Sequence, residues 1–159
     1  MAPAFTLYYN GRLDVYASVS GRDIPIYVGK AIPPGSRKGL GLGAAPRLAL
    51  FKRLGEHAES IRLASNLDIA DFTCRYLVVD DIWIPLGESL VIARFSPLWN
   101  QVIDGFGNHD PGSGRYNQLR SRWDTLHPGR PWALKCRERE ETPEQLEGEI
   151  RAYLSTFRP

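Results

Sequence analysis

Polar side chains that could act on a phosphate group fall in three places in this sequence. They are a tyrosine and a lysine at the end of an apolar run, an arginine and a histidine one helical turn apart, and a glutamate after a proline: Tyr27, Lys30, Arg53, His57 and Glu88. Phosphodiester hydrolysis needs a nucleophilic water and a cation against the charge that develops on the phosphate. A carboxylate can hold a hard cation such as Mg²⁺, and the planar fork of an arginine fits a phosphate. These residue types therefore permit phosphodiester hydrolysis if the fold brings them together.

The apolar run that contains Tyr27 predicts a short buried strand ending in a basic loop. Residues 25–31 read Pro-Ile-Tyr-Val-Gly-Lys-Ala, and residues 32–39 read Ile-Pro-Pro-Gly-Ser-Arg-Lys-Gly. Proline lacks an N–H and glycine has no side chain to pack, so that the second segment can continue neither a strand nor a helix. The strand should therefore deliver Tyr27 and Lys30 beside a hydrogen-bonding loop.

Two predicted helices carry the other polar candidates. Apolar residues at helical spacing predict a helix over residues 46–61, on which Arg53 and His57 share a face. A second helix is predicted over residues 85–95, with Glu88 in its first turn, where the helix dipole favours a carboxylate. Structural interpretations stay open: an acid at a helix start need not bind metal, and a histidine one turn from an arginine is usually a surface pair.

The remaining patterns predict a few further elements. They are strands over 4–9 and 72–79, a short extended piece over 15–17, a loop over 104–114, a helix over 118–124 and a C-terminal helix over 143–157. Thr142, Pro143 and Gln145 fit a capping box with proline at the first helical position. We expect one domain, residues 1–159, in which 136–159 form a helical extension for packing or dimerisation.

Length and composition predict a soluble, single-domain protein. The 159 residues suit one domain with a real core, and 43% hydrophobic with 24% charged residues is ordinary for a globular chain. The apolar runs are too short to cross a bilayer, and the N-terminus lacks the regions of a signal peptide. We therefore expect a cytoplasmic protein without a membrane partner. Cys74 and Cys136 have no metal-ligand spacing and are predicted to be reduced, buried thiols.

The distribution of charge predicts a phosphate-binding face, although the net charge is only +2. Acidic residues gather after residue 137, whereas basic residues lie in the segments that carry the polar candidates. The basic set comprises Lys30, Arg37, Lys38, Arg47, Lys52, Arg53, Arg115, Arg120, Arg122 and Arg130. Basic loops on a neutral body fit nucleic-acid binding, and a solvated surface arginine is the alternative for any one of them.

The order of these motifs resembles a known nuclease superfamily. Residues 27–31, Tyr-Val-Gly-Lys-Ala, are similar to the second half-motif of the GIY-YIG nucleases, which cut DNA with one divalent metal ion. Arg53, His57, Glu88 and Asn100 follow in the order and spacing of that family's other catalytic positions. Three segments resemble more closely the type II restriction endonucleases of the Eco-twenty-nine-k group: 83–90, 95–100 and 105–112. The resemblance implies an α+β (α/β sandwich) fold, with a small mixed or antiparallel central sheet flanked by helices.

The resemblance also implies a role for each catalytic candidate. Glu88 would hold Mg²⁺ or Mn²⁺, Arg53 would bind the scissile phosphate, and Tyr27 would act as general base. His57 would partner the tyrosine or the phosphate, or relay a proton. Lys30 would lower the pKa of the tyrosine or hold the phosphate, and Asn100 would orient the active-site loop or a metal-bound water. No organic cofactor is expected.

The first tyrosine of the family motif has two candidate positions in this chain. Tyr16 has a suitable distance along the chain from Tyr27, but residues 7–11 resemble the restriction group's sequence just after the motif. In this second alignment, which we favour slightly, Phe5 takes the tyrosine position and its hydroxyl is missing. Tyr16 would then be a packing residue.

The implied function is sequence-specific cleavage of double-stranded DNA by a bacterial, type II restriction enzyme. Similar enzymes act as homodimers on short GC-rich palindromes. The candidates for DNA contacts are Arg37, Lys38, Asn108, His109, Arg115, Asn117 and Arg120. Two alternatives remain: a structure-directed repair or recombination nuclease, and a catalytically silent DNA-binding module of the same fold.

Overall fold

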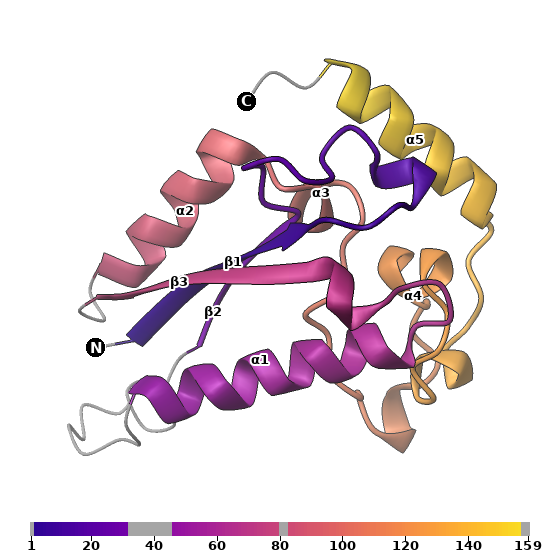
Figure 1. The fold of residues 1–159 in the computed structure, drawn as a ribbon. Helices are drawn as coiled ribbons and strands as arrows, with labels where there is room; N and C mark the ends of the chain where they lie inside the picture. Colours follow the sequence, from indigo (N-terminus) through magenta and orange to yellow (C-terminus); the bar gives the residue numbers. More distant parts are fainter. Residues whose placement is uncertain (1, 32–45, 80–82, 157–159) are drawn as a thin grey trace.

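The protein is built on a three-stranded antiparallel sheet with the strand order β2-β1-β3. A computed structural model describes residues 2–31, 46–79 and 83–156 (Figure 1). The strands are β1 (Ala2–Tyr9), β2 (Tyr27–Lys30) and β3 (Phe72–Val79). The central strand β1 places Phe5 opposite Gly29 on one side and Tyr76 on the other. The expected α+β fold is confirmed, and the sheet is antiparallel throughout.

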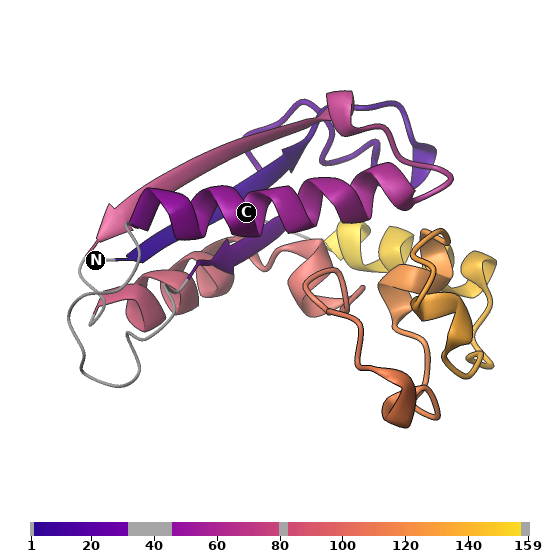
Figure 2. The same cartoon turned by 90° about the horizontal axis from the view of Figure 1, so that it is seen from below.

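Two helices cover opposite faces of the sheet. They are α1 (Pro46–Leu63) and α2 (Ile84–Phe95), and Figures 1 and 2 show the strands between them. On the α1 side, the ring centroid of Phe5 lies 5.5 Å from that of His57. On the α2 side, Lys30 forms an ion pair with Glu88. Because neighbouring residues of a strand point to opposite faces, the short strand β2 presents polar groups to both helices.

The other elements lie mostly after α2 and wrap one end of the sheet. In the described ranges they are the helices α3 (Leu98–Gln101), α4 (Arg122–Leu126) and α5 (Pro143–Thr156). The 3₁₀ turns are η1 (Asp14–Tyr16), η3 (Ile69–Asp71), η5 (Ser113–Arg115) and η6 (Ala133–Lys135). The capping box of α5 is confirmed, since the Thr142 N–H donates to Gln145 Oε1 at 2.8 Å and the Gln145 N–H donates to Thr142 Oγ1 at 3.3 Å.

Two predicted elements differ from the structure. The extended piece over residues 15–17 is wrong, because the N–H groups of Tyr16 and Ala17 donate to carbonyls three residues earlier and close the 3₁₀ turn η1. The helix predicted over 118–124 begins only after Ser121, whose hydroxyl oxygen accepts the Asp124 N–H at 3.1 Å and so caps α4.

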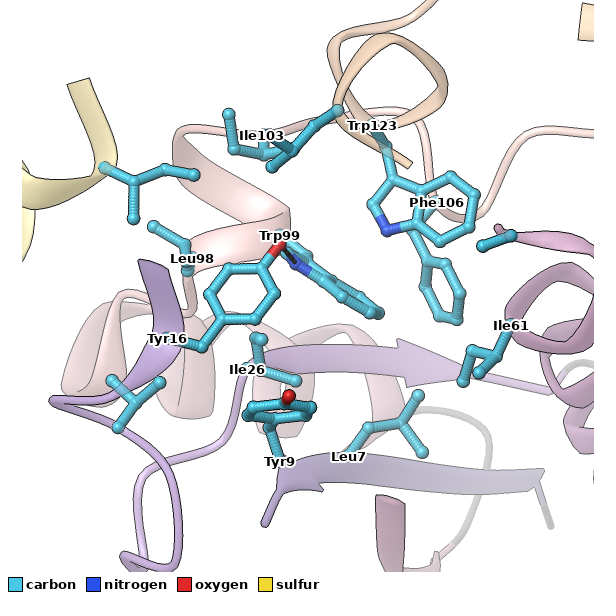
Figure 3. Close-up of a cluster of buried hydrophobic side chains, with 14 of the residues drawn as sticks. Leu7, Tyr9, Tyr16, Ile26, Ile61, Leu98, Trp99, Ile103, Phe106 and Trp123 are labelled. Atoms are coloured by element: carbon cyan, nitrogen blue, oxygen red, sulfur yellow. Dashed lines mark hydrogen bonds between the residues drawn. The ribbon is translucent and has the colours of Figure 1, made fainter. Parts of the chain in front are cut away.

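The main core joins the sheet to α1, α3 and α4 (Figure 3). Its largest members are aromatic: Phe5, Tyr9, Tyr16, Trp99, Phe106 and Trp123. The Tyr16 hydroxyl oxygen accepts the Trp99 Nε1–H at 2.9 Å and also bonds to His127 Nε2. Buried polar groups need such partners, and these two bonds fix Tyr16 within the core.

Both cysteines are free thiols, but only Cys136 is buried. Cys74 is exposed because it lies on β3, an edge strand of the sheet. The prediction of a buried Cys74 is therefore wrong. Within residues 2–31, 46–79 and 83–156, no helix combines the length and the apolar character needed to cross a bilayer.

Candidate active site

A cleft of about 480 Å³ opens where β2 meets α1 and α2. It is lined by Tyr27, Gly29, Lys30, Ala31, Ala49, Lys52, Arg53, Glu56, Glu88 and His109. Four of the six catalytic candidates are in this lining: Tyr27, Lys30, Arg53 and Glu88. The fold thus brings the phenol, the ammonium, the guanidinium and the carboxylate to one hollow, although they come from three separate elements.

Arg53 is the most firmly held polar group of the cleft. Its Nη1 donates to Glu56 Oε2 at 2.9 Å and lies 2.7 Å from His109 Nε2, while its Nη2 donates to the Gly107 carbonyl oxygen at 3.1 Å. The side chain is only 21% exposed. The guanidinium is therefore fixed on α1 with its charge beside the cleft, as phosphate binding requires.

Tyr27 meets Arg53 at Gly107. A Cβ atom on Gly107 would lie 2.9 Å from Tyr27 Oη and 3.3 Å from Arg53 Nη2, so that the phenol and the guanidinium both lie against this glycine. Burial raises the pKa of Tyr27; the adjacent Arg53 charge acts in the opposite direction, and the Glu88 charge adds to the rise. The phenol is therefore protonated at neutral pH.

The His57 ring packs against the rings of Tyr27 and Phe106. It stacks on Phe106 at 4.5 Å between centroids, and its centroid lies 5.2 Å from that of Tyr27. In the described part of the chain its buried Nε2 has no hydrogen-bond partner. Burial, assisted by the positive Arg53, lowers the pKa of His57 to about 3. The imidazole is thus neutral at physiological pH, and the geometry makes it a packing partner of the tyrosine.

Glu88 and Lys30 form an ion pair in the lining of the cleft. Lys30 Nζ lies 2.6 Å from Glu88 Oε2, and the two side chains are 35% and 20% exposed. The position predicted for Glu88 in the first helical turn is wrong, because α2 begins at Ile84 and its first turn contains no acidic residue. The ammonium of Lys30 rather than the helix dipole is therefore the close positive partner of the carboxylate.

Asn100 does not line the cleft but fixes its edge. Its Nδ2 donates to the Val28 carbonyl oxygen at 2.9 Å, and its Oδ1 accepts the Val28 N–H at 2.8 Å. One side chain thus pairs with the outer edge of β2, as a neighbouring strand would. Asn100 holds the strand that carries Tyr27 and Lys30.

Phe5, and not Tyr16, lies beside the catalytic tyrosine candidate. The Phe5 ring centroid is 6.2 Å from that of Tyr27, and a Cβ on Gly29 would lie 2.7 Å from Phe5 Cζ. Tyr16 is held in the core by Trp99 and His127. The position nearest to Tyr27 and His57 on β1 therefore carries no hydroxyl.

The fold places the DNA-contact candidates in different environments. Asn108, Arg115 and Asn117 are exposed, whereas His109 reaches the cleft. Arg120 instead donates through Nε to the Ala133 carbonyl oxygen at 3.0 Å and through Nη2 to that of Leu134 at 3.3 Å. Its guanidinium therefore braces η6. Arg37 and Lys38 lie outside the described residues.

Two arginines assigned to the phosphate-binding face have structural partners instead. Arg122 bonds to Glu141 and Glu149 and so joins α4 to the C-terminal segment. Arg130 is buried, and its Nε lies 2.6 Å from Asp124 Oδ1. Their assignment to that face is wrong, because each guanidinium is already occupied by carboxylates of the protein.

Arg130 is an important residue of the site whose structural role the sequence did not indicate. Besides its pair with Asp124, it donates to the carbonyl oxygens of Gly105, Phe106 and Asn108 at 2.9–3.1 Å. These bonds hold the loop that carries Gly107 and His109 against the cleft. Glu56, also missed, had a visible signal in its i, i+3 spacing from Arg53.

Comparison of the sequence with known protein families finds a match. A family profile described as the Eco29kI GIY-YIG domain matches residues 1–154 of the chain, and this range includes every residue of the cleft. Among curated proteins, none matches the chain at a significant level. GIY-YIG proteins are nucleases that generally use divalent metal ions. The chain is therefore a member of the Eco29kI GIY-YIG family of restriction-endonuclease-like proteins.

Proposed function

We propose that this protein is a sequence-specific DNA endonuclease of type II restriction character, which hydrolyses phosphodiester bonds of double-stranded DNA with one divalent metal ion. One observation carries the proposal: the Arg53 guanidinium, the Tyr27 phenol and the Glu88 carboxylate line one cleft. A nuclease of this family needs a phosphate ligand, a polar group near the attacking water and a metal ligand. The cleft supplies one side chain for each need.

The residues of the cleft fit Mg²⁺ or Mn²⁺ with Glu88 as the protein ligand. In the described ranges no group of three or more histidine, cysteine or acidic side chains is placed to hold a metal. A hard cation that keeps most of its waters needs only one carboxylate, and Glu88 is partly exposed in the cleft. When bound, such an ion would supply positive charge to the phosphate and lower the pKa of a bound water.

The other side chains in and around the cleft would then bind the phosphate, add positive charge and hold Tyr27 in place. Arg53 would bind the scissile phosphate from a position that three neighbours already fix. Lys30 would add a second positive charge next to Glu88. Asn100 would keep β2, and with it Tyr27, at the correct distance from α1. His57 would exclude water from the rear face of the phenol.

The proposed substrate is a short GC-rich palindrome bound by a homodimer, with one active site for each strand. A two-fold protein matches a two-fold DNA site. The exposed side chains of Asn108, Arg115 and Asn117 come after Gly107, which lies against Tyr27 and Arg53, and we propose that they contact bases. Arg37 and Lys38 complete the proposed contact set. We further propose that the 159 residues act as one domain, in a bacterial restriction-modification pair.

The direct test is plasmid cleavage in the presence of Mg²⁺. We expect discrete fragments from the wild type and none from Glu88→Ala or Arg53→Ala. Glu144→Ala is the matched control, since it removes an exposed carboxylate from α5 and should leave the pattern unchanged. Identical fragments from Glu88→Ala and the wild type would rule out the metal assignment.

The absent hydroxyl at Phe5 favours one second candidate, a DNA-binding module that does not cleave. Such a module would bind duplex DNA with or without divalent ions and would leave every plasmid intact. A structure-directed nuclease would instead nick a branched junction and yield no discrete plasmid fragments. Incubating the wild type with a plasmid and with a four-way DNA junction separates the three functions.

A further inference from the structure

His109 is a cleft residue whose position suits proton transfer. It follows the loop 105–108 and lies beside α1, with Nε2 2.7 Å from Arg53 Nη1. A guanidinium can only donate hydrogen bonds, so that Nε2 must be the acceptor. The imidazole in this arrangement is therefore neutral, with its proton on Nδ1 and the lone pair of Nε2 directed at the Arg53 guanidinium.

The charged groups around His109 come from every side of the cleft. On α1, Arg53 disfavours a second positive charge, whereas Glu56 Oε2, 3.9 Å from Nε2, favours one. Lys52 lines the same hollow, as do Lys30, Glu88 and Tyr27 from β2 and α2. The His109 side chain is 64% exposed, so that water can reach it.

The loop before and after His109 is held in place. Arg130 binds the carbonyl oxygens of Gly105, Phe106 and Asn108. After His109, the Asp110 carboxylate accepts the Gly112 N–H at 2.8 Å and the Tyr116 hydroxyl at 3.1 Å. The imidazole is thus presented to the cleft by a braced segment, as a catalytic group requires.

The other candidates for a proton acceptor are poorly suited. Burial raises the pKa of Tyr27, so that a phenolate is scarce at neutral pH. His57 is enclosed by Phe5, Tyr27 and Phe106 and is not part of the cleft lining. An imidazole ordinarily titrates between about pH 5 and 8, which is the range that general-base catalysis at neutral pH needs.

We propose that His109 is a catalytic residue, the general base that takes a proton from the attacking water. The proposal rests on the nuclease function proposed above. As the water oxygen bonds to phosphorus, its proton passes to Nε2; the bond from phosphorus to the leaving oxygen breaks, and that oxygen keeps the electron pair and is protonated by solvent. A phosphate that engages the Nη groups of Arg53 would release the lone pair of Nε2. Substrate binding would thereby make Nε2 of His109 available to accept a proton.

The kinetic test compares single-turnover plasmid cleavage by the wild type, His109→Gln and the control Ser113→Ala, an exposed residue of the same loop. We expect His109→Gln to cleave about 100-fold more slowly or worse. Its affinity for a duplex spanning the mapped cut, measured by fluorescence anisotropy without divalent ions, should stay within about threefold of the wild type, as for a group that acts in the transition state. The wild-type rate should rise with pH, as expected when a general base loses its proton, and His109→Gln should lose that rise.

Chemical rescue distinguishes a catalytic role of His109 from a structural one. Because the side chain is exposed, free imidazole should reach the space left in His109→Ala and restore part of the rate, while leaving Arg53→Ala unaffected.

Several results would overturn the proposal. An unchanged rate or pH profile in His109→Gln, or no rescue by imidazole, removes His109 from catalysis. A loss of DNA affinity as large as the loss of rate would make it a DNA-contact residue instead. If the wild type itself cleaves no plasmid, the proposed nuclease function fails and this role fails with it.

Discussion

Asn100 and Val28 form a reciprocal pair in which one amide side chain satisfies both backbone groups of a strand residue. The pair closes the outer edge of β2 directly beside Tyr27. A side chain that replaces a strand partner in this way helps to fix the position of β2, together with the pairing of β2 with β1 on its other edge.

Replacing Asn100 by alanine should therefore affect both stability and cleavage. It leaves the N–H and the carbonyl of Val28 without their partner, and an unsatisfied pair of this kind destabilises a protein by about 1–3 kcal/mol. Urea denaturation should show this loss, and cleavage should fall as β2 loosens. Asn117→Ala, an exposed amide, is the control for stability. Equal stability of Asn100→Ala and the wild type would contradict the structural role.

Gly107→Ala should separate the phenol from the guanidinium without unfolding the protein. The new methyl group would lie 2.9 Å from Tyr27 Oη and 3.3 Å from Arg53 Nη2, so that both side chains must move. A misplacement of about 1 Å in an active site can reduce the rate about 100-fold. Gly114→Ala is the matched control, because its Cβ would meet nothing within 4 Å. Plasmid cleavage and the melting temperature should be measured together: full activity in Gly107→Ala would mean that the close approach is unimportant.

The two buried histidines should make stability depend on pH. The pKa of His57 and of His127 is lowered by burial to about 3 in the folded protein, whereas an unfolded histidine titrates near 6.5. Between these values the unfolded state binds more protons, so that the free energy of unfolding is highest above about pH 6.5 and falls as the pH falls towards 3. Each histidine should contribute a slope of up to about 1.4 kcal/mol per pH unit.

His57→Phe isolates one of these two contributions. It keeps an aromatic ring on Phe106 and removes the unpartnered Nε2. Urea unfolding at several pH values should therefore show a shallower slope and no large loss of stability near neutral pH. A slope equal to that of the wild type would exclude His57 as a source of acid sensitivity.

Lys30→Met should strengthen metal binding, since Lys30 occupies an oxygen of the proposed metal ligand. The ion pair with Glu88 is partly exposed, and such a pair contributes at most on the order of 1 kcal/mol. We expect Mn²⁺ to bind about threefold to fivefold more tightly to Lys30→Met, measured by calorimetry without DNA. Lys135→Met is the control for net charge, and Glu88→Gln should abolish binding. Weaker binding to Lys30→Met would mean that Lys30 helps to build the metal site.

Local sequence patterns were sufficient for the elements whose ends are set by nearby residues. The strand over Phe72–Val79 and the capped helix that begins at Pro143 have the predicted starts and close to the predicted lengths. Tyr27 lies on a strand as its apolar neighbours indicated. The cap of α5 joins residues three apart, whereas both strands pair with the distant β1; their apolar patterns are nevertheless visible within each strand.

The parts of the site that depend on distant contacts could not be predicted in this way. Arg130 belonged to a basic set that suggested a phosphate-binding face, yet it lies buried on Asp124 and on three carbonyl groups of another segment. Arg120 likewise braces backbone rather than facing solvent. The exposure of Cys74 depends on β3 lying at the edge of the sheet, which is a property of the strand order.

The three bonds that immobilise Arg53 have a thermodynamic consequence for recognition. A long side chain that rotates freely loses about 1.5–2 kcal/mol of rotamer entropy when a ligand orders it. Folding has already ordered this guanidinium, so that association with a phosphodiester spares most of that loss. The cleft is in this respect preorganised, and its affinity for a phosphate should exceed that of a solvent-mobile arginine with the same charge.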